Sequence, residues 1–145
     1  MTPVTMLSGM TSRLNPYLHF RGNAREAMEF YRSVLGGELQ LMTFSQVGSD
    51  DPEIADQVMH GQLETPQGWT LMGSDTPPGM DHNPGDNFTI SLSGDDADEL
   101  RGLFEKLSAG GAVHTPLEKQ MWGDEFGMCV DRFGVAWMVN IGQTA

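Results

Sequence analysis

The chain has 145 residues, 39% of them hydrophobic, and its 20 acidic and 8 basic side chains give a net charge of −12. This hydrophobic fraction supports one ordinary domain, or two small half-domains with a shared core, and excludes global disorder. The acidic surface repels phosphate backbones, so we expect no nucleic-acid partner, and no apolar run approaches the ~20 residues of a membrane span.

The N-terminal stretch and the single cysteine bear on the compartment. Residues 1–13 show no charged region followed by an apolar region, so we expect no secretory signal and assign them to a flexible extension. Cys129 can form no internal disulfide, which together with the missing signal predicts a reducing, cytoplasmic location. It lies in the strand-like run FGMCV with no histidine nearby in the sequence, so we expect a buried, inert thiol.

The first half begins with an alternating strand, LNPYLHF, at residues 14–20. A helix follows in NAREAMEFYRSVLGG, where apolar residues recur at helical spacing, Asn23 is the expected N-cap and a glycine pair ends the helix. Three strand-like runs, ELQLMTF, DQVMHGQLE and WTLMGS, complete a first module over residues 14–75. Residues 76–87, rich in Pro, Gly and Asp, are typical of a linker.

The second half repeats this order over residues 88–141. The run NFTISLS alternates, with Phe88 on the same side as the other apolar residues. The helix DADELRGLFEKLSAGG has Asp96 as its expected cap, and AVHTPLE, FGMCVD and VAWMVNI follow as strands. The two helices superpose at an offset of 73 residues, which indicates an internal repeat.

The repeated order of one strand, one helix and three strands predicts an α+β fold. Each βαβββ module would form a four-stranded sheet with its helix on one face, so that the other face needs cover or lines a site. Two modules together would form a curved mixed sheet around a central cavity, and such a cavity is the default binding site.

The runs NPYLHFRGNAREAMEFYRSVLGGELQLMTF, VMHGQLE, LMGSD and MWGDEFGMCVDRFGVAWMVN resemble the vicinal oxygen chelate superfamily, which includes glyoxalase, bleomycin-resistance and dioxygenase proteins. The resemblance is to its PhnB-like branch, often labelled demethylubiquinone methyltransferase-like, and covers residues 14–141. The sequence has no G-x-G-x-x-G and no glycine-rich strand–turn–helix loop of the kind that holds an adenosyl cofactor.

Metal-using members of this superfamily place His, Glu or Gln at four strand positions, where a divalent ion polarises the substrate's oxygens. The resemblance puts these positions on Asn15 or Pro16, near Met72, on Thr89 or Asn87, and on Met138. None of these residues is a carboxylate or imidazole, and methionine suits soft ions rather than Zn, Mg, Mn or Fe(II). We therefore expect no metal and no other cofactor.

Strand alternation points other polar side chains toward the expected cavity, and their types suit a small, oxygen-bearing organic ligand. Met72 and Met138 either form its apolar floor or pack as ordinary core residues. His19 is alternatively a solvated strand residue, and Trp122 is either a lid over the cavity or a packing anchor. The predicted ligand-binding residues are Tyr17, His19, His60, Gln62, Met72, Thr89, Ser91, Trp122 and Met138.

These observations favour a metal-free protein that binds a small organic molecule in the cavity between the modules. The alternative is a lyase, isomerase or dioxygenase-type enzyme that uses a divalent metal, or His60 or Tyr17 as a proton carrier. A third interpretation is an interaction module whose exposed sheet face serves dimerisation only. The resemblance implies a homodimer, with the cavity formed within one chain or across two.

Overall fold

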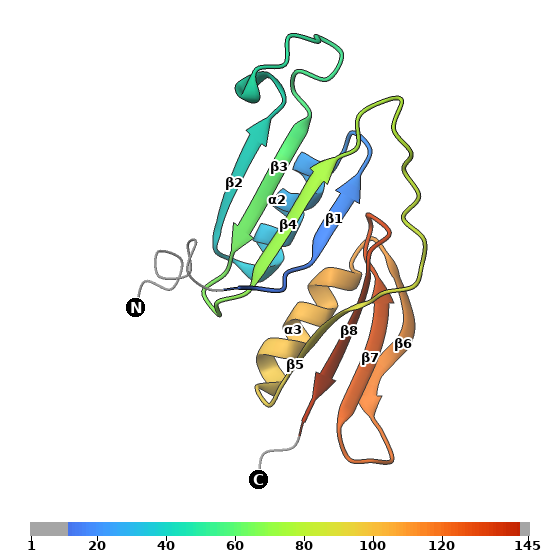
Figure 1. The fold of residues 1–145 in the computed structure, drawn as a ribbon. Coiled ribbons are helices and arrows are strands. Elements are labelled where there is room, and N and C mark those ends of the chain that lie inside the picture. The colour runs from blue at the N-terminus through green and yellow to red at the C-terminus, as the bar shows by residue number, and fades with distance from the viewer. Residues whose placement is uncertain (1–11, 143–145) are drawn as a thin grey trace. The chain divides into compact units, whose positions relative to one another are not determined.

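The computed structural model describes residues 12–142, so nearly all of the predicted extension 1–13 lies outside the described part (Figure 1). The chain divides between Pro84 and Gly85 into two compact units, which are described one at a time. No helix among residues 12–142 is long and apolar enough to cross a bilayer.

The first unit is a four-stranded sheet with one helix on one face (Figure 1). The strand order is β1-β4-β3-β2; β1 and β4 are parallel and the other neighbours antiparallel. Its elements are β1 (Tyr17–Phe20), α2 (Ala24–Leu35), β2 (Glu38–Thr43), a 3-10 turn (Ser45–Val47), β3 (Val58–Glu64) and β4 (Thr70–Asp75).

The second unit repeats the first, with strand order β5-β8-β7-β6 and a parallel pair β5–β8. Its elements are β5 (Ile90–Gly94), α3 (Ala97–Ser108), β6 (Ala112–Lys119), β7 (Glu125–Val130) and β8 (Ala136–Ile141). The predicted α+β class, with one strand, one helix and three strands written twice, is confirmed.

The first strand of each unit begins later than the sequence pattern predicted. Leu14 is fully exposed and precedes β1, so the predicted strand start at residue 14 is wrong. Pro16 has no N–H to donate to a sheet, and only its carbonyl pairs, with the backbone N–H of Met72. Phe88 likewise precedes β5 and is half exposed.

Both helices bury the apolar stripe that the sequence predicted. The buried residues of α2 are Ala24, Ala27, Met28, Tyr31, Val34 and Leu35, and those of α3 are Leu100, Leu103, Phe104 and Leu107. Asp96 caps α3 as expected, because its side chain accepts a hydrogen bond from the backbone N–H of Glu99 at 3.1 Å. Asn23 holds the N-cap position of α2 but makes no side-chain cap, so that part of the prediction is wrong.

The missing cap of α2 is supplied by Asp75 at the end of β4. One carboxylate oxygen accepts from the backbone N–H groups of Gly22 and Ala24 at 2.8 and 2.9 Å, and the other from Val58 at 2.9 Å. Asp75 is 4% exposed, so these three bonds satisfy a buried charge and tie the helix start to β3 and β4.

Each unit has one glycine at which the chain passes directly over a strand end. A Cβ on Gly37 would lie 2.1 Å from the carbonyl oxygen of Glu64, and one on Gly111 would lie 2.0 Å from that of Val130. Gly111 thus takes the place of Gly37, although the helix offset of 73 pairs Gly37 with Gly110. The loop after α3 is one residue longer.

Candidate functional site

The face of the first sheet that points away from α2 carries most of the predicted polar residues. Leu18 and Phe20 of β1 are buried on the helix side, so alternation directs Tyr17 and His19 to the opposite face. Tyr17 pairs with Met72 in β4, and Met72 pairs with Gln62 in β3. We call this surface the polar face; its central residues are Tyr17, His19, His60, Gln62, Glu64, Thr70 and Met72.

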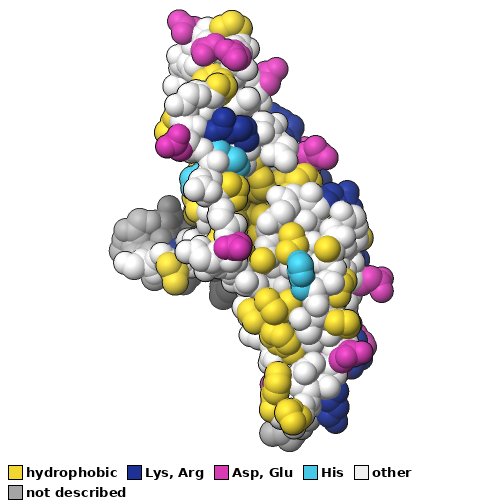
Figure 2. All heavy atoms as spheres, turned by 90° about the vertical axis from the view of Figure 1, so that its right-hand side faces the viewer, with side chains coloured by type: hydrophobic (Ala, Val, Ile, Leu, Met, Phe, Trp, Pro, Cys, Tyr) yellow, Lys and Arg dark blue, Asp and Glu magenta, His cyan; other side chains and the backbone are white. Residues whose placement is uncertain are grey.

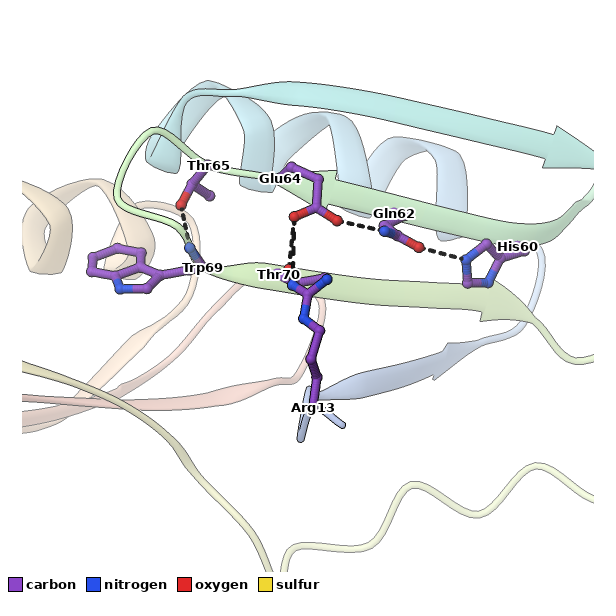
Figure 3. Close-up of polar contacts among 7 residues, drawn as sticks. All are labelled: Arg13, His60, Gln62, Glu64, Thr65, Trp69 and Thr70. Atoms are coloured by element: carbon purple, nitrogen blue, oxygen red, sulfur yellow. Dashed lines mark hydrogen bonds and ion pairs between the residues drawn. The ribbon is translucent and has the colours of Figure 1, made fainter. Parts of the chain in front are cut away.

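Side chains of the polar face form a continuous hydrogen-bonded chain. The Tyr17 hydroxyl lies 3.1 Å from Nδ1 of His60, which it reaches across the intervening strand β4. Nε2 of His60 lies 3.3 Å from Oε1 of Gln62, and the Gln62 amide nitrogen donates to Oε2 of Glu64 (Figure 3). Three of the predicted ligand-binding residues are therefore joined to one another.

The carboxylate end of this chain was not predicted from the sequence. Oε1 of Glu64 accepts a hydrogen bond from the Thr70 hydroxyl at 2.7 Å and lies 3.7 Å from the Arg13 guanidinium (Figure 3). Arg13 also donates to the Thr70 oxygen. The alternation of HGQLE places Glu64 on the same face as His60 and Gln62, and that was the available signal.

Two histidine rings lie beside the Tyr17 ring: the His19 ring centroid is 5.3 Å from that of Tyr17, and the His60 ring centroid is 5.6 Å from it. Tyr17 is 39% exposed, and Ser74, which faces the same side from β4, is 8% exposed. The three rings thus cover the middle of β4 and leave the phenol accessible.

The helix-distal face of the second sheet is more apolar than the polar face. Met138 pairs with Ser91 in β5 and with Met128 in β7, and all three point away from α3. Met72 and Met138 are each the third residue of the last strand in their unit. Thr89 precedes β5, so it does not share in the sheet pairing. Figure 2 shows hydrophobic side chains gathered over this unit, with acidic side chains scattered.

Trp122 lies in the turn between β6 and β7. It is 61% exposed, and its ring contacts Phe126 edge-on at a centroid distance of 6.3 Å. This exposure argues against the packing-anchor interpretation within the second unit, and it makes Trp122 an accessible aromatic side chain between β6 and β7.

A solvent-open pocket of about 400 Å³ lies on the second unit, and it was not predicted from the sequence. Its lining includes Asp95, Lys119 and Glu125. The adjacent Arg101 guanidinium donates to Glu125, and this hydrogen bond lowers the pKa of Glu125 and raises that of Arg101. The positive charge of Arg101 and the negative charge of Glu125 thus partly neutralise each other beside the pocket.

Cys129 is buried at 1% exposure, as the sequence predicted. Burial raises the pKa of its thiol to about 11, and the negative charge of Asp131 adds to the shift. A thiol in this state carries almost no thiolate at neutral pH, which argues against a nucleophilic role.

The positions beside the two methionines offer poor ligands for a divalent ion. Tyr17, rather than Asn15 or Pro16, is the helix-distal neighbour of Met72, and Ser91, rather than Thr89 or Asn87, is that of Met138. Thioether, phenol and hydroxyl groups are not the imidazole, thiolate or carboxylate ligands by which proteins usually hold Zn, Mg, Mn or Fe(II). Among residues 12–142 no group of three His, Cys, Asp or Glu side chains could hold a metal ion.

Comparison with known proteins agrees with this architecture. Residues 12–140 match the family model described as 3-demethylubiquinone-9 3-methyltransferase. The chain belongs to this family. Together with the similar structures below, the match makes the chain a PhnB-like member of the vicinal oxygen chelate superfamily.

Solved structures extend the comparison over nearly the whole chain. Protein PA1353 from Pseudomonas aeruginosa is 40% identical, with a TM-score of 0.81 over 92% of this chain and 100% of that one. A PhnB protein from Bacillus cereus is 25% identical, with a TM-score of 0.69 over 90% of this chain and 100% of that one. A glyoxylase/bleomycin resistance protein/dioxygenase domain from Frankia, 18% identical with a TM-score of 0.65 over 94% and 95% of the two chains, shares the fold.

Within the described residues 12–142, neither strand-to-helix connection matches the cofactor site that the methyl transfer in the family description requires. The connection from β1 to α2 is Arg21-Gly22-Asn23, and that from β5 to α3 is Asp95-Asp96. Neither is the glycine-rich strand–turn–helix loop that cradles an adenosine-containing cofactor in a doubly wound sheet. We therefore derive no methyl-transfer step from residues 12–142.

Proposed function

We propose that this protein binds a small organic molecule without a metal, and that the polar face supplies the groups that orient the ligand. The observation that carries the proposal is the hydrogen bond between the Tyr17 hydroxyl and His60, continued through Gln62 to Glu64. A partly exposed phenol held in place by such a chain is a pre-organised contact for an oxygen- or nitrogen-bearing head group.

The apolar part of the ligand would rest on methionine. Met72 lies beside Tyr17 on the polar face, and Met138 holds the corresponding position in the second unit. Thioether side chains are flexible and polarizable, so they adapt to an apolar body of irregular shape. The thioethers stand where metal-using relatives would place ligands for an ion, which favours binding without a metal.

The proposal includes the arrangement expected from the sequence. Modules 14–75 and 88–141, joined by the linker 76–87, would enclose the ligand between their helix-distal faces, within one chain or across two copies of a homodimer. Thr89, Ser91 and Trp122 of the second module would complete its lining. We propose a cytoplasmic location, because a single cysteine has no second cysteine in the chain to pair with, and a free thiol suits a reducing compartment.

A ligand panel with paired histidine variants tests the proposal. Purified protein is titrated with catechol, benzyl alcohol and 3-phenylpropan-1-ol while amide shifts are followed by NMR. We expect shifts on the polar face and a roughly three- to tenfold weaker affinity for His60→Ala, the equivalent of one hydrogen bond. His114→Ala, an exposed histidine of β6, is the matched control and should bind like the parent.

Elemental analysis of the same preparation completes the test. We expect much less than one equivalent of any divalent ion per chain. One equivalent of zinc, manganese or iron that survives dialysis, or equal losses in the two histidine variants, would count against the proposal.

A second candidate is an enzyme that uses Tyr17 or His60 as a proton carrier, and the 3.1 Å contact between them favours it. A carrier of this kind removes a C–H proton next to a carbonyl and returns a proton from solvent. Dihydroxyacetone and hydroxyacetone incubated with the protein in D₂O would then gain deuterium, as seen by NMR. No gain over His60→Ala would exclude this activity for these two compounds.

A further inference from the structure

The chain of hydrogen bonds on the polar face has a direction, which follows from its carboxylate end. Glu64 accepts from the Thr70 hydroxyl at 2.7 Å and faces the Arg13 guanidinium at 3.7 Å. A carboxylate so placed has only acceptor oxygens to offer. The Gln62 group beside it must therefore be the amide nitrogen, as Figure 3 shows, because two oxygens in contact would repel each other.

The orientation of Gln62 then determines the proton position on His60. With its nitrogen at Glu64, Gln62 turns its oxygen toward Nε2 of His60 at 3.3 Å. An amide oxygen only accepts, so Nε2 carries the hydrogen. A neutral imidazole has one N–H, so Nδ1 is left with a lone pair. The Tyr17 hydroxyl, 3.1 Å away, must then donate to Nδ1.

We propose that this directional relay makes the Tyr17 oxygen an acceptor and thereby selects ligands with a hydrogen-bond donor, a hydroxyl or ammonium, in their head group. The ligand class rests on the proposed function. The Tyr17 hydroxyl donates its one hydrogen to the hydrogen bond with Nδ1 of His60, so its oxygen offers a ligand only lone pairs. An ether or carboxylate head group finds no donor at this atom.

Three further features agree with this selection. The imidazoles of His19 and His60 contact the Tyr17 ring at centroid distances of 5.3 and 5.6 Å and hold it in place, while Tyr17 remains 39% exposed and within reach of a ligand. Met72 lies next to Tyr17 and can support an apolar body attached to the head group. The net charge of −12 acts in the same direction, since it disfavours anionic ligands.

The tautomer of His60 tests the relay without any ligand. Long-range ¹H–¹⁵N correlation spectra at neutral pH distinguish a hydrogen on Nε2 from one on Nδ1, and we expect it on Nε2. Glu64→Gln should give a mixture, because a neutral amide no longer dictates the orientation of Gln62. Glu38→Gln removes the same charge from the residue paired with Glu64 in β2 and should leave the tautomer unchanged. A hydrogen on Nδ1 in the parent protein would overturn the relay.

Four probes with one phenylpropyl body test the ligand class: 3-phenylpropan-1-ol, its methyl ether, 3-phenylpropylammonium and 3-phenylpropanoate. We expect the alcohol and the ammonium to bind roughly three- to tenfold more tightly than the ether, and Tyr17→Phe to remove the difference between alcohol and ether. Added salt separates the two donors, because it weakens the ammonium and spares the alcohol.

The outcomes separate this inference from the proposed function. If the ether shifts the polar-face amides with the affinity of the alcohol, donor selection is wrong and the binding function stands. If none of the probes shifts these amides, donor selection is wrong and the proposed function is contradicted for this ligand size as well. An alcohol preference that persists in Tyr17→Phe would assign the acceptor to another residue and overturn the inference.

Discussion

Replacing Asp75 with asparagine removes one acceptor from a buried carboxylate that receives three backbone hydrogen bonds. If the remaining oxygen keeps its contacts with Gly22 and Ala24, the new amide NH₂ faces the N–H of Val58, which is 0% exposed. A buried donor without an acceptor costs about 1–3 kcal/mol, and the two surviving bonds lose their charge assistance. We expect Asp75→Asn to lower the free energy of unfolding by about 2–4 kcal/mol.

Urea denaturation followed by circular dichroism measures this loss, which is a large part of the about 5–15 kcal/mol typical of a domain. Amide exchange should also become faster at Gly22, Ala24 and Val58, the three donors concerned. Asp81→Asn, at an exposed aspartate, is the control, and we expect a change within about 0.5 kcal/mol. A loss below about 1 kcal/mol for Asp75→Asn would show that the carboxylate does not hold the start of α2 as argued.

Three further predictions concern other parts of the chain. Gly111→Ala should cost at least about 2 kcal/mol in urea denaturation, since its Cβ would meet the Val130 backbone, whereas Gly102→Ala, with open space in α3, should stabilise by about 0.5–1 kcal/mol. Cys129 should resist iodoacetamide at pH 8 until the protein unfolds. Because its pKa is raised to about 11, the thiol contributes to the free energy of unfolding in full below the unfolded-state pKa of about 8.5, and this contribution is lost as the pH rises toward about 11. Cys129→Ala should not show this loss. Because the pKa of Glu125 is lowered, this carboxylate contributes to the free energy of unfolding at pH values above its ordinary pKa, and the contribution is lost as the pH falls. Arg101→Gln should raise the titration midpoint of the Glu125 carboxyl group, measured by ¹³C NMR.

Much of the local structure could be predicted from the sequence. The 3.6-residue spacing of apolar side chains located both helices and their buried faces, and glycine pairs marked where each helix ends. Strand alternation correctly assigned Tyr17 and His60 to the side away from the helix. These features depend on a few neighbouring residues, so a single sequence contains enough information to predict them.

The strand ends were less predictable because they depend on pairing with distant residues. Leu14 fits the alternating pattern, yet β1 begins at Tyr17, where the pairing with Met72 of β4 starts. Asn23 is a good local cap, yet Asp75 supplies the bonds from 51 or more residues away. Local preference yields in both cases to a partner that the sequence does not identify.

The candidate site also combines features that follow from local sequence with features that depend on distant residues. The sequence by itself determined which side chains share a face, because that follows from the two-residue period of a strand. Only the tertiary structure decided that β4 lies between β1 and β3, that Tyr17 therefore reaches His60 across it, and that Arg13 and Glu64 complete the chain. Strand order and register are decided by packing of the whole sheet on its helix, a long-range balance that no local pattern records.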